Sequence, residues 1–139
     1  MRTLFFIALI AGSLGCQSES LDIRAPYRIR LNTVSPGTTL RVHQRYVLPL
    51  ELLTDSYYSA YGYQLVFYQQ TGLGRLQRYQ EGIDTSRVFQ KVPVVLPLGR
   101  SVWQFTPEAV GSCEVVLIAQ QERGYTQPDT VRMNFQIIP

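Results

Sequence analysis

Few residues of this 139-residue chain could carry out acid–base or nucleophilic chemistry, and their spacing does not bring them together. His43 is the only histidine. No pair of histidines or cysteines stands at metal-ligand spacing, and no stretch resembles an acidic calcium loop. Seven acidic residues fall mostly in expected loops: Asp55, Glu81, Asp84, Glu108, Glu114, Glu122 and Asp129. The sequence therefore predicts no catalytic residue, metal site, cofactor or small-molecule substrate, and we expect a protein that is not an enzyme.

A short glycine motif, Gly72-Leu73-Gly74, could be mistaken for a phosphate-binding loop. Such a loop needs a helix after it and a third glycine, and neither appears here. The residues that follow, 75–79, continue a strand pattern. We therefore interpret the motif as a hairpin turn between two strands.

The two cysteines, Cys16 and Cys113, differ in their surroundings. Residues 1–15 begin with a positive charge, continue with an apolar run and end with small residues, which is the layout of a signal peptide. The apolar run is shorter than the roughly twenty residues that a membrane span requires. Cys113 lies in an apolar segment without cationic neighbours, so we expect a small buried side chain rather than a reactive thiol.

Cys16 directly follows Gly15, and in this respect the signal resembles that of a bacterial lipoprotein. The resemblance implies that the thiol of Cys16 carries lipid, that residues 16–25 form a lipidated tether, and that the chain binds the membrane through this anchor. Gln17 stands where an aspartate would retain a lipoprotein in the inner membrane. By that analogy the outer membrane is favoured, with the periplasmic or surface side left open. The alternative is a plain secretory signal with an incidental cysteine.

The charge of the chain is modest but unevenly distributed. Thirteen basic residues against ten acidic ones give +3, and loss of Arg2 with the signal leaves +2, which is too near neutral to indicate nucleic-acid binding. Residues 24–45 contain no acidic residue. Four arginines of this region are candidate contacts for an acidic partner or for anionic headgroups: Arg28, Arg30, Arg41 and Arg45. The alternative is a solvated strand face.

Tyrosines gather just before an apolar strand, in residues 57–63. Tyr63 shares the parity of the apolar residues after it and is expected in the core. Tyr57, Tyr58 and Tyr61 precede the strand, and tyrosine is common in recognition surfaces. We predict that these three contact a partner. The alternative is that they cap the end of the domain.

Residues 26–139 show the period-two alternation of β-strands, interrupted by turn residues. The clearest strands are expected near residues 63–69, 101–106, 113–120 and 131–137. Pro49 interrupts an apolar set and lacks an amide donor, which predicts an edge or a break there. Seven or eight short strands without a helical pattern predict an all-β fold, an immunoglobulin-like β-sandwich.

Several short motifs together resemble the conjugative transposon protein TraQ family. They are the lipoprotein start, Leu21-Asp22-Ile23 followed by Tyr27, Phe67-Tyr68-Gln69-Gln70, the Gly72-Leu73-Gly74 turn followed by Leu76, and the closing pair of strands. The resemblance implies an immunoglobulin-like domain without defined catalytic residues. It also implies a small exported lipoprotein that helps to assemble a conjugation apparatus by binding its other proteins.

Two other functions fit the same residues. The first is a surface lipoprotein that binds glycan or another extracellular ligand by stacking on Trp103 or on the tyrosines. The second is a protease-inhibitor-like sandwich that presents residues 81–91 as a loop. The sequence contains no feature that favours the inhibitor.

Overall fold

The computed structural model describes residues 28–55, 62–79, 86–123 and 126–139, and this part of the chain contains strands and no helix. The strands are β1 (Ile29–Thr33), β2 (Thr39–Arg41), β3 (Tyr46–Thr54), β4 (Tyr63–Thr71), β5 (Gly74–Arg78), β6 (Arg87–Val88), β7 (Val94–Leu96), β8 (Gly99–Pro107), β9 (Gly111–Gln121) and β10 (Asp129–Ile138). The all-β prediction is confirmed. The predicted signal peptide (1–15) and tether (16–25) lie outside the described residues.

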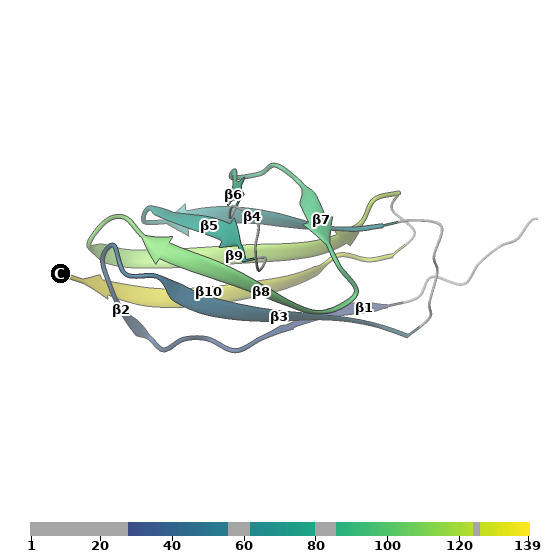
Figure 1. Cartoon of the computed structure of the whole chain (residues 1–139), viewed down its shortest axis with the longest axis horizontal. Coiled ribbons are helices and arrows are strands. Elements are labelled where there is room, and N and C mark those ends of the chain that lie inside the picture. Colours follow the sequence, from purple (N-terminus) through teal and green to yellow (C-terminus); the bar gives the residue numbers. More distant parts are fainter. Residues whose placement is uncertain (1–27, 56–61, 80–85, 124–125) are drawn as a thin grey trace, which may run out of the picture.

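Two five-stranded sheets pack face to face (Figure 1). The first sheet has the order β1-β3-β8-β5-β6, and the second has the order β2-β10-β9-β4-β7. Immunoglobulin constant-type domains place strands A, B, E and D in one sheet and C, F and G in the other. Strands β1, β3, β8 and β5 reproduce the first set, and β4, β9 and β10 reproduce the second. The immunoglobulin-like sandwich is therefore confirmed.

The strand count exceeds the predicted seven or eight because short edge strands are added to this frame. β2, β6 and β7 are two or three residues long, too short to show periodicity in the sequence. β7 forms one edge of the second sheet, between Pro93 and Pro97. Short edge strands flanked by proline discourage pairing with other chains.

The core lies between the sheets and is made by every second residue of the long strands. Trp103 and Phe105 of β8 are fully buried, as are Phe67 of β4 and Leu117 of β9. The rings of Phe105 and Phe135 stack across the two sheets, with centroids 6.0 Å apart. Since each strand alternates buried and exposed positions, register alone decides which side chains remain on the outside.

Pro49 lies in β3, which is an inner strand, so the edge strand that was one of the two predictions is wrong, whereas the predicted break occurs on the β1 side of the strand only. β3 pairs with β8 along Tyr46–Leu52 and with β1 only from Leu50 to Thr54. The carbonyl of Pro49 accepts a hydrogen bond from Thr33 Oγ1 at 2.9 Å and therefore points toward β1. The nitrogen of the same residue points to the same side, where the pairing with β1 has already ended. The proline therefore removes no hydrogen bond from the β3–β8 ladder.

The Gly72-Leu73-Gly74 segment is not a hairpin turn, and that prediction is wrong. β4 pairs with β7 and β9 in the second sheet, whereas β5 pairs with β6 and β8 in the first. The segment therefore carries the chain from one sheet to the other. Gln69 fixes this crossing, because its Oε1 accepts the Gly74 amide proton at 2.6 Å while its Nε2 donates to Cys113 Sγ at 3.3 Å.

The outer edge of β1 is closed by a carboxylate. The Leu31 amide donates to Asp129 Oδ2 at 2.7 Å, and Arg28 forms a parallel bridge with Gln127. Asp129 begins β10, so the contact joins the edge of the first sheet to the second. The amide of a buried edge residue is thus satisfied without a further strand.

Candidate functional site

Cys113 and His43, the nucleophilic side chain and the imidazole of the described residues, lie in different surroundings. Cys113 is buried, and burial raises the pKa of its thiol, so the neutral form is favoured. This confirms the expected buried position. His43 is exposed in the turn between β2 and β3, with a φ of 62°, and its amide donates to the Pro107 carbonyl at 2.8 Å. More than 60 residues of sequence separate the two side chains, and no described contact joins them.

Most described acidic residues on the strands are paired individually with arginines. Glu51 contacts Arg100 at 3.3 Å, and Arg132 contacts Glu114 at 3.4 Å. Glu108 lies 3.4 Å from Arg75. Within the described ranges no group of three or more histidine, cysteine or acidic side chains could hold a metal ion, and no helix is long and apolar enough to cross a membrane. Glu81 and Asp84 lie outside these ranges.

The predicted arginine contacts divide between the two ends and the two faces of the sandwich. Arg28 and Arg30 lie at the start of β1, beside the end of β3, whereas Arg45 precedes the start of β3. Nine residues of β3 separate these ends by about 27 Å. Arg41 is exposed on the outer side of the second sheet. All four side chains are exposed, and they do not form one cluster.

Of the tyrosines in residues 57–63, only Tyr63 is among the described residues. Tyr63 is 7% exposed and belongs to the core, as expected. Tyr57, Tyr58 and Tyr61 lie outside the described residues, and their contact with a partner stays a prediction.

Trp103 cannot act as a stacking platform, and its predicted role in glycan binding is therefore wrong. Its side chain is fully buried. The indole N–H donates to Ser101 Oγ at 2.8 Å, and the Arg78 guanidinium lies 5.9 Å from the ring centroid. Both contacts hold the ring inside the sandwich.

The sequence interpretation missed an exposed apolar surface on the outer side of the first sheet. Pro49 of β3 pairs with Val102 of β8, and the Tyr79 amide donates to the Val102 carbonyl at 3.0 Å. Val47 lies two residues from Pro49 on the same side of β3. Val34 follows the end of β1 and lines the same groove as Pro49 and Val102. We call these five residues the apolar band: Val34, Val47, Pro49, Tyr79 and Val102. The signal in the sequence was the presence of apolar residues at both parities of β3 and β8.

No protein-family model matches the chain, and no curated protein matches it. The solved structures that are similar to it include three from Bacteroides species. A lipoprotein from Bacteroides thetaiotaomicron, solved by solution NMR, is 19% identical, with a TM-score of 0.68 over 85% of this chain and 86% of that one. A conjugative transposon lipoprotein from Bacteroides eggerthii, solved by crystallography, is 12% identical, with a TM-score of 0.65 over 81% and 98%.

The third, a conjugate transposon protein from Bacteroides vulgatus solved by solution NMR, is 15% identical, with a TM-score of 0.65 over 85% of this chain and 91% of that one. The three alignments cover most of both chains, so the likeness concerns the whole sandwich. At these identities the likeness establishes the fold.

Proposed function

We propose that this protein is a lipid-anchored, non-enzymatic component of a conjugative transfer apparatus, which acts by binding other proteins of that apparatus. The observation that carries the proposal is the likeness to three Bacteroides structures over most of both chains, one named a lipoprotein, one a conjugate transposon protein and one both. The motifs that resemble the TraQ family point to the same role, and we propose membership of that family.

The chemistry of the described residues supports a binding role. Burial favours the neutral form of the Cys113 thiol, and Glu51, Glu108 and Glu114 are each paired with an arginine. Conversely, the outer side of the first sheet exposes valines, a tyrosine and arginines together. Aromatic residues and arginine are enriched where proteins meet.

The proposed anchor is lipid on Cys16, with the outer membrane as the expected location. Two or three acyl chains hold a protein stably at a bilayer, whereas a single chain holds it only reversibly. Mass spectrometry of the protein extracted from membranes should find an N-terminal cysteine that carries the lipid. An unmodified N-terminus would contradict the anchor, and separation of the two membranes would test the location.

Deletion of the gene in a donor strain tests the function. We expect the frequency of transfer in matings to fall and to recover when the wild-type gene is supplied in trans. A Cys16→Ser variant should restore transfer poorly although its domain is folded. Transfer at the wild-type frequency without the gene would contradict the proposal.

A further inference from the structure

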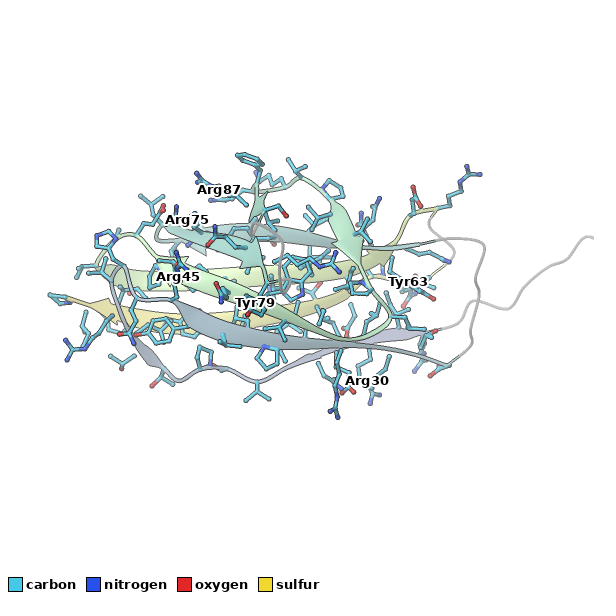
Figure 2. The ribbon with its side chains drawn as sticks, viewed as in Figure 1. Arg30, Arg45, Tyr63, Arg75, Tyr79 and Arg87 are labelled. Atoms are coloured by element: carbon cyan, nitrogen blue, oxygen red, sulfur yellow. The ribbon has the colours of Figure 1, made fainter. Side chains whose placement is uncertain are left out.

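The outer side of the first sheet carries a pattern that an ordinary solvated strand face lacks. The register sets which outward residues of neighbouring strands lie side by side. Leu53 of β3 lies beside Arg30 of β1, and across β3 and β8 the pairs are Glu51 with Arg100, Pro49 with Val102 and Val47 with Gln104. A fully apolar row, Pro49 with Val102, therefore lies next to a fully charged row, Glu51 with Arg100. Arg30, Arg45, Arg75, Tyr79 and Arg87, labelled in Figure 2, extend this face from β1 to β6.

The apolar band is exposed although it lies at the centre of the face. The exposed fraction is 70% for Val34, 55% for Val47, 46% for Tyr79 and 41% for Val102. A groove of about 350 Å³ runs beside it, lined by Val34, Pro49 and Val102 together with Asn32, Glu51 and Arg100. Exposed apolar residues that gather on one face, with polar residues around them, are typical of sites where proteins associate.

The rim of this face is positively charged. Its described residues include six arginines and three acids, an excess of three positive charges: Arg28, Arg30, Arg45, Arg75, Arg87 and Arg100 against Glu51, Asp55 and Glu108. Two of the acids are already paired, Glu51 with Arg100 and Glu108 with Arg75. The planar guanidinium group of arginine can donate two parallel hydrogen bonds to one carboxylate.

We infer that the outer side of the first sheet, with the apolar band at its centre and arginines around it, is the docking face for an acidic segment of another protein. The inference rests on the proposed function only in that the partner would belong to the conjugation apparatus. Apolar side chains of the partner would cover the band. Its carboxylates would reach Arg30 and Arg45, which lie at opposite ends of β3 and have no acidic partner among the described ion pairs.

Two other occupants fit the face less well. A second copy related by a two-fold axis would bring two positive faces together, and like charges repel. A membrane surface would need side chains that reach about 5–10 Å into the boundary between headgroups and acyl chains. The band consists mainly of valine and proline, whose short side chains stay close to the plane of the sheet.

The test is site-specific photo-crosslinking in donor cells that carry the element, with the full-length lipoprotein. A benzoylphenylalanine replaces Val47 or Tyr79 in the apolar band, and Asn134 on the outer side of β10 as the control position. We expect a covalent adduct with another protein from the two band positions and none from Asn134. The crosslinked peptide of the partner should carry net negative charge.

Charge reversal supplies the second arm. Arg30→Glu together with Arg45→Glu should reduce the adduct from Val47 by about fivefold or more, because rim charges govern encounter with an oppositely charged surface. Arg41→Glu, on the second sheet, should leave it unchanged. Both variants should keep the wild-type circular dichroism spectrum, since all three arginines are exposed.

Four crosslinking results would each overturn the inference: no adduct from the band, equal adducts from Asn134, an adduct with lipid, or an adduct with a second copy of this chain. Transfer frequency separates this failure from failure of the proposed function. If deletion lowers transfer while the arginine double variant transfers normally, the face is wrong and the function stands. If deletion has no effect, the function fails, and the adducts alone decide the docking face.

Discussion

Gly74→Ala should destabilise the sandwich because the crossing between sheets leaves no room for a side chain. A Cβ built on Gly74 would lie 2.5 Å from Cε2 and Cζ of Phe105 and 3.1 Å from the Thr106 carbonyl oxygen. Phe105 cannot move aside easily, since its ring is fully buried and stacked on Phe135. Overpacking a close-packed core costs about 1–3 kcal/mol, and with two ring atoms this close we expect about 2–3 kcal/mol.

The measurement is urea unfolding followed by the fluorescence of Trp103, which is the only tryptophan and is buried. The midpoint should fall while the slope with denaturant stays unchanged. Gly99→Ala is the matched control, because a Cβ there meets nothing within 4 Å. Its only cost is the backbone strain of alanine at a φ of +84°. That variant should lose about 1–2 kcal/mol.

A double-mutant cycle identifies the cause. Phe105→Leu shortens the group that meets the new methyl, so Gly74→Ala should cost at least about 1 kcal/mol less in that background than in the wild type. An equal cost in both backgrounds would refute the assignment of the clash to Phe105. A Gly74→Ala protein as stable as the wild type would refute the close approach itself.

Three further predictions concern the contacts that hold the sheets together. Asp129→Ala should lower the free energy of unfolding by about 1–3 kcal/mol and speed hydrogen exchange at the Leu31 amide. Asp129→Asn, which keeps an acceptor, should lower it less. Unchanged exchange at Leu31 would contradict the hydrogen bond. Because burial raises the pKa of Cys113 above the ordinary value of 9.0, the unfolded chain releases the thiol proton first, so stability should fall as pH rises above 9. Unfolding at pH 8 and pH 10 should show a larger loss for the wild type than for Cys113→Ala, and equal losses would argue against the shift. Ser101→Ala should cost about 1 kcal/mol and shift Trp103 emission, as the indole N–H loses its acceptor; unchanged emission would show that the bond does not set the environment of the ring.

The long strands could be predicted from sequence because apolar and polar residues alternate along each of them, and this alternation shows which side chains are buried. Trp103 and Phe105 share a parity, and both are in the core. The sheet to which a strand belongs is a different kind of information, since it depends on pairing between distant residues. The 71–74 segment looks like any glycine turn, and only the pairing of β5 with β8 shows that it crosses between sheets.

The candidate site was harder to predict for the same reason. Arg41 and Arg45 are four residues apart, yet the turn at His43 leaves Arg41 in β2 of the second sheet and Arg45 just before β3 of the first. The apolar band joins residues from 34 to 102, which become neighbours only through the register of β1, β3 and β8. The residue types could be taken from the sequence, but which of these residues are neighbours depends on the register of the strands.

The parallel pairing of β2 with β10 has a mechanical consequence. β1 begins at the right-hand end of Figure 1, the C-terminus lies at the left-hand end, and β2 runs beside β10 in the same direction. A force that pulls the start of β1 and the C-terminus apart would act along β2 and β10. It would load the hydrogen bonds between these two strands all at once, in shear, and would not break them one after another. Gln136 to Thr38 and Val42 to Ile138 are two such bonds, at 2.8 and 2.9 Å. Single-molecule stretching from the two ends of the domain would measure the force at which this pair of strands separates.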